Sequence, residues 1–140
     1  MVSFIYTHCP RVCPMTVHNL QDLQDSLSLR GMKGVEFVSL TYDPNRDSPS
    51  VLKRYADVRG IKLSDWDFLT GTKTCIDSVL HRVKISYTMV DSSHSKNGDL
   101  TYFIHHPDEV ALVDERGNVR GLYGGSDMDF TRIIADIETL

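Results

Sequence analysis

The sequence predicts an α/β domain with a mixed sheet flanked by helices on both faces. In the first half of the chain, segments with strand character alternate with segments of helical periodicity. In the second half, a paired-strand pattern and a last helix complete the chain. A chain of 140 residues has the usual size of one domain, so residues 1–140 are expected to form a single domain.

The strands of the first half are expected at residues 1–6, 35–42 and 66–69, where β-branched and aromatic residues are frequent. The first helix is expected to begin at Pro14, since proline is favoured at the first helical position. Its apolar stripe consists of Val17, Leu20, Leu23 and Leu27.

The second helix is expected to begin where Ser48 can act as the N-cap and Pro49 as the first helical residue. It should extend to about Gly60. A third helix begins near residues 70–72 and turns an apolar face inward, made of Ile76, Val79, Leu80 and Val83.

The polar residues 92–98 are expected to form a loop or a hairpin connection. Extended segments follow at residues 101–104 and 109–114, and a turn at residues 115–118 leads to a partner strand at residues 119–123. Asp127 should open the last helix, with an inward face made of Phe130, Ile133, Ile134 and Ile137.

Charge and hydropathy argue against two classes of partner. The formal net charge is −4, and basic residues alternate with acids, so a nucleic-acid surface is not expected. No apolar run approaches the roughly 20 residues that span a bilayer. Because the first residues already form a strand, we expect an N-terminal portion to be missing, and any membrane anchor with it.

Cys9 and Cys13 form a C-x₃-C pair at the first strand-to-helix junction, and this position is typical of a thioredoxin-like domain. A helix N-terminus favours thiolates over thiols, and two thiolates with one imidazole make a three-coordinate site suited to copper. The alternative interpretation is a structural disulfide or two unrelated buried thiols. Cys75, remote from the pair, is expected to be a buried core thiol.

Three motifs carry a family resemblance. Tyr6-Thr-His-Cys-Pro-Arg-Val-Cys-Pro14 resembles the Sco/SenC signature Y-T-x-C-P-x-x-C-P. Asp43-Pro-Asn-Arg-Asp-Ser-Pro49 resembles the family's D-P-x-R-D-T/S-P segment, and the residues from Tyr102 to His106 resemble its Y-x-V-D-H-S stretch. The resemblance extends from Phe4 to about Gly124.

The resemblance implies a thioredoxin-fold protein that binds Cu(I) or Cu(II) through Cys9, Cys13 and His106. Such proteins help to assemble the binuclear copper centre of cytochrome c oxidase, by copper delivery, by reduction of the target cysteines, or both. It also implies tethering to a membrane, facing the bacterial periplasm or the mitochondrial intermembrane space. The implied partner is the copper-centre subunit of the oxidase or another copper chaperone.

The histidine ligand has an alternative one residue away. His105 stands where the family usually has Asp, so it is kept as an alternative ligand to His106. Neighbours in an extended segment point to opposite sides, so only one of them should face the cysteines. Asp43 is a candidate to orient a ligand through a hydrogen bond, or else it closes a turn before Pro44.

The other histidines have less specific expectations. His8 is expected at the surface, and His18 and His81 are expected to be partly buried packing residues. His94 is expected in a solvated loop.

Two functions from different classes remain open. The first is a copper-binding assembly factor, and the second is a thiol–disulfide oxidoreductase that acts through Cys9 and Cys13 as a redox-active pair without copper. A peroxidase of the peroxiredoxin type fits less well, since it needs a lone reactive cysteine. His106 separates the first two, because a dithiol reductase has no need of a third ligand.

Overall fold

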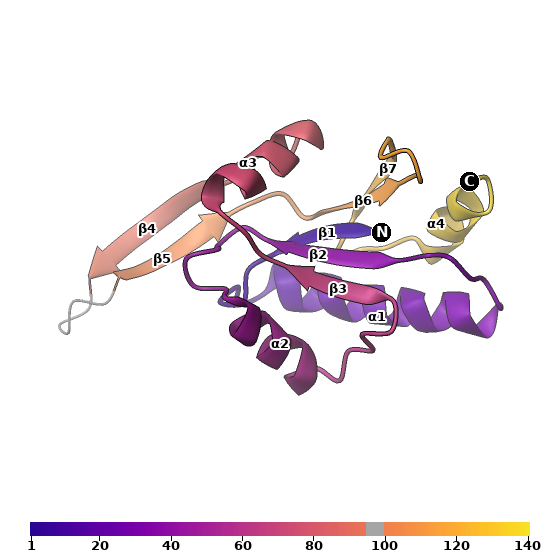
Figure 1. The fold of residues 1–140 in the computed structure, drawn as a ribbon, viewed down its shortest axis with the longest axis horizontal. Coiled ribbons are helices and arrows are strands. Elements are labelled where there is room, and N and C mark those ends of the chain that lie inside the picture. Colours follow the sequence, from indigo (N-terminus) through magenta and orange to yellow (C-terminus); the bar gives the residue numbers. More distant parts are fainter. Residues whose placement is uncertain (95–99) are drawn as a thin grey trace.

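A five-stranded sheet forms the centre of the molecule. The computed structural model describes residues 1–94 and 100–140 (Figure 1). The strands follow the order β3-β2-β1-β6-β7 across the sheet. Their bounds are β1 Val2–Ile5, β2 Phe37–Thr41, β3 Trp66–Leu69, β6 Glu109–Val113 and β7 Val119–Gly124.

The sheet is mixed, as the sequence predicts. β1 pairs parallel to β2, and β2 pairs parallel to β3. β1 also pairs antiparallel to β6, and β6 pairs antiparallel to β7. With a cysteine motif where β1 passes into the first helix, the described residues have a thioredoxin-like fold.

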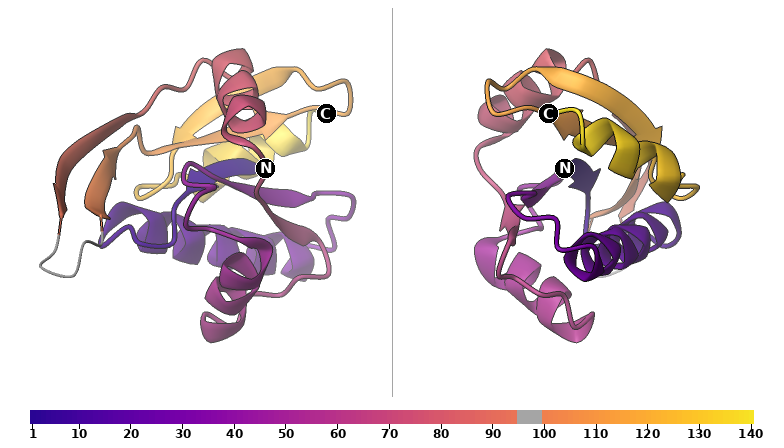
Figure 2. Two further views of the ribbon diagram at one scale, coloured as in Figure 1. Left: turned by 60° about the vertical axis from the view of Figure 1, so that its left-hand side comes forward. Right: turned by 90° about the vertical axis from the view of Figure 1, so that its right-hand side faces the viewer.

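Helices cover both faces of this sheet. Their bounds are α1 Val12–Leu29, α2 Pro49–Val58, α3 Lys73–Arg82 and α4 Phe130–Ile137. α1 and α2 lie on one face, and α3 lies on the other (Figure 1). α4 lies next to α1 (Figure 2). Among the described residues, no helix combines the length and apolar character that a membrane span requires.

The predicted apolar stripe of α1 is confirmed, since Val17, Leu20, Leu23 and Leu27 are all buried in the core. The cap of α2 is also confirmed: the side chain of Ser48 accepts a hydrogen bond from the Val51 N–H, with Pro49 as the first helical residue. Burial of apolar side chains such as those of the α1 stripe is the main favourable contribution to folding.

Three helix predictions need correction. α1 begins at Val12, two residues before Pro14. α4 begins at Phe130 because Asp129, not Asp127, accepts the capping hydrogen bond from the Arg132 N–H. In α3, Ile76 and Leu80 are buried, whereas Val79 is exposed, because the inward stripe is narrower than predicted.

Two strands form a separate hairpin, β4 Thr88–His94 and β5 Leu100–His105. It projects from the body of the molecule (Figure 1). The predicted loop at residues 92–98 is partly wrong, since residues 92–94 belong to β4 and residues 95–98 lie outside the described residues. β4 was not predicted, because few of its residues are apolar and they do not alternate regularly. The end of β5 leads into His106.

Candidate metal centre

Three loops meet at one edge of the sheet, namely at one end of its central strands. β1 and β2 are parallel, so both end at this edge, and Ile5 of β1 pairs with Thr41 of β2. β6 is antiparallel to β1, with Ser3 opposite Val110, so β6 begins where β1 ends. The cysteine loop (residues 7–13), the turn after β2 and the histidine segment (residues 105–108) therefore lie together.

The cysteine loop places its two sulfurs at the start of α1. The Cys9 N–H donates to the Tyr6 carbonyl over 3.1 Å, which closes a tight turn. Cys13 is the second residue of α1, and its N–H donates to the Cys9 Sγ over 3.3 Å. The Cys9 sulfur thus accepts one of the free N–H groups of a helix N-terminus, where negative charge is stabilised.

His106 brings an imidazole to the same place. Its Nε2 lies 3.5 Å from the Cys13 Sγ, and its Nδ1 lies 2.9 Å from the Pro107 carbonyl oxygen. A carbonyl oxygen can only accept, so the Nδ1 carries the proton and the Nε2 lone pair faces the sulfurs. The ring packs against Tyr42 at 4.7 Å and edge-on to Tyr6 at 5.8 Å between centroids.

One potential ligand atom each from Cys9, Cys13 and His106 lies within 4.8 Å of the other two. In the described part of the chain, no other group of three His, Cys, Asp or Glu residues is gathered in this way. His105 is exposed, so the structure places His106 beside the cysteines and His105 away from them. Two thiolate sulfurs are soft donors that suit Cu(I), and an imidazole also binds copper.

The two thiols differ in acidity. The hydrogen bond from the Cys13 thiol lowers the pKa of Cys9 well below its usual range, and contacts with His106 and backbone N–H groups add to this effect. Donating to Cys9 raises the pKa of Cys13, as does its burial. Before any metal binds, the pair is therefore one thiolate and one thiol.

The Cys9 thiolate also affects the pKa of the His106 imidazole. Burial by itself would lower the pKa of His106, but the contact with the Cys9 sulfur and the hydrogen bond to Pro107 outweigh burial and raise the pKa. The three groups therefore share protons as one coupled unit.

Asp43 lies close to the centre but holds a different partner. Its carboxylate accepts from the Tyr102 hydroxyl over 2.6 Å and from the Arg46 guanidinium. The Arg46 guanidinium also stacks 3.6 Å above the Tyr102 ring. Asp43 makes no hydrogen bond to Cys9, Cys13 or His106 in the structure. It anchors β5, the strand that leads to His106, so any effect on that ligand is indirect.

Two aspartates not singled out from the sequence hold the loops. Asp47 is fully buried and accepts from the Thr7 N–H over 3.1 Å, from the Thr7 hydroxyl and from the Thr41 hydroxyl. It therefore fixes the cysteine loop two residues before Cys9. Asp47 belongs to a motif already quoted for the family, and this was the signal available in the sequence.

Asp108 plays the corresponding part in the histidine segment. Its carboxylate accepts from the Thr16 hydroxyl of α1 over 2.9 Å and from the Ser126 N–H over 2.8 Å. The segment that carries His106 is thus joined to the helix that carries Cys13. No local pattern pointed to Asp108, because Thr16 is 92 residues away along the chain.

The remaining predicted residues lie elsewhere or at the surface. Cys75 is exposed, so the expectation of a buried core thiol was wrong. It precedes Ile76, whose side chain occupies the inward face of α3. His18 and His81 are exposed as well, which corrects their predicted burial, whereas His8 is exposed as expected. The side chain of His94 lies outside the described residues.

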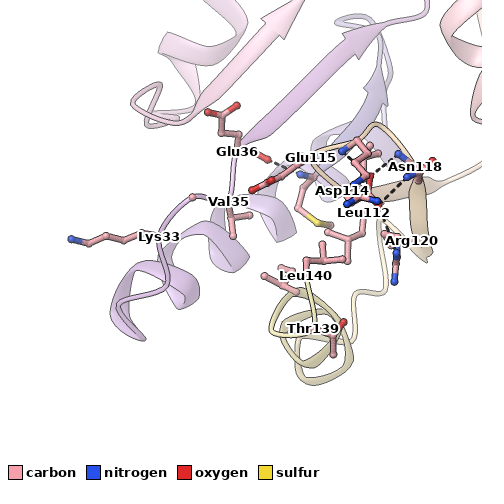
Figure 3. A pocket seen from close by; sticks show the side chains of 15 residues that line it. Lys33, Val35, Glu36, Leu112, Asp114, Glu115, Asn118, Arg120, Thr139 and Leu140 are labelled. Atoms are coloured by element: carbon pink, nitrogen blue, oxygen red, sulfur yellow. Dashed lines mark hydrogen bonds and ion pairs between the residues drawn. The ribbon is translucent and has the colours of Figure 1, made fainter.

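A cavity of about 840 Å³ lies at the opposite edge of the sheet (Figure 3). Lys33, Glu36, Asp114 and Arg120 are among the residues that line it. None of the residues of the candidate centre takes part. The lining mixes both signs of charge and does not indicate one class of ligand.

A sequence model of the SCO1/SenC family matches residues 1–140. A SCO2-like protein of Rickettsia prowazekii is 31% identical over 117 residues, which cover 84% of this chain and 54% of that protein. The chain thus spans about half the length of the curated relatives it matches first.

Three solved structures have the same fold. A SCO1/SenC family lipoprotein of Bacillus anthracis has a TM-score of 0.81 at 27% identity, over 99% of this chain and 79% of the other. BsSco, described as a member of the Sco family of cytochrome c oxidase assembly proteins with a disulfide switch, has a TM-score of 0.76 at 28% identity, over 99% and 77%.

The third structure is Arabidopsis thaliana ScoI with copper bound, with a TM-score of 0.81 at 23% identity, over 99% of this chain and 83% of the other. At that identity the likeness concerns the fold. The match of the family model to the whole length, together with the gathered cysteines and histidine, establishes that this chain belongs to the SCO1/SenC family.

Proposed function

We propose that this chain binds copper and takes part in assembling the binuclear copper centre of cytochrome c oxidase. The observation that carries the proposal is the convergence of Cys9, Cys13 and His106, with ligand atoms within 4.8 Å of one another. BsSco, a structure with the same fold at 28% identity, belongs to a family of cytochrome c oxidase assembly proteins. Copper is the cargo here, carried as Cu(I) or Cu(II).

The three proposed ligands differ in their protonation before the ion binds. Cys9 supplies a thiolate without further cost, whereas Cys13 must release its proton as the metal binds. His106 presents the Nε2 lone pair, because its Nδ1–H is bonded to Pro107. Cys13 is only 1% exposed, so the ion would be shielded from water on that side.

A partner must be able to take the ion by ligand exchange. Since Cys9 is 9% exposed, we propose that it is the sulfur an incoming ligand reaches first. The partner proposed is the copper-centre subunit of the oxidase or another copper chaperone. We propose further that the whole protein is tethered to a membrane, as its relative from B. anthracis is a lipoprotein. It would face the bacterial periplasm or the mitochondrial intermembrane space.

The second candidate function is that of a thiol–disulfide oxidoreductase. The observation in its favour is the opposite shift of the two thiols, with a thiolate at Cys9 beside a thiol at Cys13. The Cys9 thiolate would attack a partner disulfide, and Cys13 would then displace the partner as a dithiol. The protein would be left with a Cys9–Cys13 disulfide.

Copper titration of the reduced protein tests the proposal. We expect one copper ion per chain, and loss of tight binding when Cys9 or Cys13 is replaced by Ser, since a hydroxyl is a hard and poorly ionised ligand. His106→Ala should weaken binding by more than about 100-fold, because it removes a ligand rather than a group behind one. His105→Ala is the matched control and should change little.

The same variants distinguish the two candidate functions. His106→Ala should leave the Cys9–Cys13 disulfide able to form and to be reduced, as measured by alkylation and mass spectrometry. If the Cys9→Ser, Cys13→Ser double variant retains chelator-resistant copper, the proposal is wrong. If neither histidine variant alters copper binding while dithiol reductase activity is intact, the oxidoreductase function replaces it.

A further inference from the structure

The turn before Cys9 presents His8 to solvent. The hydrogen bond from the Cys9 N–H to the Tyr6 carbonyl leaves Thr7 and His8 at the corners of the turn. His8 is exposed, whereas Cys9 is 9% and Cys13 1% exposed. An ion that approaches the cysteine loop from solvent therefore meets the His8 imidazole more readily than either sulfur.

The hydrogen bonds around Thr7 determine which ring nitrogen of His8 is free. The Thr7 hydroxyl donates its single proton to the Asp47 carboxylate, which can only accept. The same Thr7 oxygen lies 3.1 Å from the His8 Nδ1, so it must accept a proton from that nitrogen. The neutral ring therefore carries its proton on Nδ1 and its lone pair on Nε2.

Asp47, Thr7 and His8 form a carboxylate–hydroxyl–imidazole series. A histidine that binds a metal commonly donates its second ring N–H to such an oriented acceptor, which fixes the tautomer and the direction of the ring. Asp47 is fully buried and also accepts hydrogen bonds from the Thr7 N–H and the Thr41 hydroxyl, so the carboxylate that orients Thr7 is held in place. His106 has the same tautomer, with its Nδ1–H on Pro107.

We propose that His8 is a transient copper ligand through which Cu(I) enters and leaves the site, an inference that rests on the proposed copper function. His8 is not one of the three residues whose ligand atoms lie within 4.8 Å of one another, so it is not a ligand of the resting site. It lies one residue before Cys9, in the turn that the Cys9 N–H closes on the Tyr6 carbonyl.

The transfer is a ligand exchange without electron transfer. A bond from Cu(I) to the donor molecule breaks as the bond to the His8 Nε2 forms. The ion then passes to the Cys9 thiolate, the Cys13 sulfur and the His106 Nε2, and the bond to His8 breaks. The Cys13 thiol proton goes to solvent, and copper remains Cu(I) throughout.

A ligand that acts only during transfer affects the rate of loading more than the affinity. The test is stopped-flow loading of the reduced protein from the Cu(I)–bicinchoninate complex, followed by loss of the visible absorption of that complex. Competition with the same chelator at equilibrium gives the affinity. His8→Gln should slow loading by about tenfold, or about 1.4 kcal/mol in the barrier. Its affinity should not fall by a comparable factor.

Two further variants separate a ligand from a structural residue. His8→Met supplies a thioether that binds Cu(I) but cannot donate to Thr7, so it should restore fast loading. His18→Gln is the matched control, since its side chain is 72% exposed on α1, and it should load like the unaltered protein.

Three results would overturn the inference: wild-type loading rates in His8→Gln, slow loading in His8→Met, or an equal loss of rate and affinity in His8→Gln. The proposed function fails separately, if the unaltered reduced protein does not bind copper at equilibrium, and the role of His8 then falls with it.

Discussion

The cysteine loop and the histidine segment are each held by an aspartate, but the two aspartates differ in burial and in reach. Asp47 is fully buried and binds Thr7 of the loop and Thr41 at the end of β2. Asp108 is partly buried and joins the histidine segment to Thr16 of α1 and to Ser126 after β7. The first aspartate holds a loop to the sheet, whereas the second holds two ligand-bearing segments to each other.

This difference separates stability from ligand geometry. A fully buried acceptor with three donors contributes to folding, because each donor left without a partner costs free energy. A partly buried acceptor can be replaced by water at lower cost, but the segment that it positions can then move. The four predictions that follow test this comparison.

Of the two aspartates, Asp47 should have the larger effect on stability when it is replaced by Ala. The replacement leaves the Thr7 N–H and two threonine hydroxyls without their acceptor, which should lower the free energy of unfolding by about 3 kcal/mol. Urea denaturation of the reduced protein measures the change. Asp57→Ala is a suitable control, since the Asp57 side chain is 56% exposed and forms an ion pair with the exposed Lys53. A loss below about 1 kcal/mol for Asp47→Ala would contradict the role assigned to its burial.

Asp108→Ala should cost less stability, about 1–2 kcal/mol, but should weaken copper binding by about 10–100-fold. The reason is that His106 lies two residues before Asp108, and the segment that carries it would lose its hydrogen bond to Thr16 of α1. Chelator competition measures the affinity, with the exposed Asp127→Ala as control. If copper binding is unchanged while stability falls, Asp108 has no more influence on the centre than a structural residue.

The lowered pKa of Cys9 predicts an unusual pH dependence of its alkylation. A group with a depressed pKa stays ionised as the pH falls, so the Cys9 rate with iodoacetamide should change little between about pH 6 and 8. In the unfolded chain the rate should rise about tenfold per pH unit below an ordinary thiol pKa near 8.5. The Cys75→Ala background simplifies the measurement, and mass spectrometry identifies the site. A tenfold rise per unit in the folded protein would remove the thiolate–thiol assignment.

The smallest effect is expected for Cys75→Ala. Because Cys75 is exposed, the free energy of unfolding should stay within about 0.5 kcal/mol and copper binding should be unchanged. By contrast, Leu80 lies on the same helix but is only 2% exposed, so Leu80→Ala should lower the free energy of unfolding by about 2–5 kcal/mol. A loss of copper in Cys75→Ala would mean that the site is not confined to the two segments compared above.

Most of the fold could be predicted from the sequence because the patterns that indicate it are local. The strand at Trp66–Leu69, the stripe of α1 and the cap of α2 all depend on residues within a few positions of one another. Errors occurred where local evidence was weak. β4 has few apolar residues. In α3, the exposed Cys75 and the buried Ile76 are adjacent, so an error of one residue in the position of the inward face changes which of them is buried.

The parts of the candidate centre that are close together in the sequence were the easiest to predict. Cys9 and Cys13 are four residues apart, so their proximity follows from one turn and one helix start. His106 comes 93 residues after Cys13 and was found through the family resemblance. Asp47 and Asp108 were missed as supports, since hydrogen bonds between loops leave no periodic pattern in the sequence. His8 was expected at the surface, but its tautomer depends on the partner of Thr7 and could not be inferred.

Cys13 belongs to the hydrophobic core as well as to the candidate centre, with 1% of its surface exposed. Unfolding must therefore separate the ligands, and any ion bound there would be lost in the same transition. By mass action, copper at 100 times its dissociation constant would add about 2.7 kcal/mol to the free energy of unfolding. The melting temperature of this chain should thus rise with free copper, and thermal denaturation becomes a measure of how fully the site is occupied.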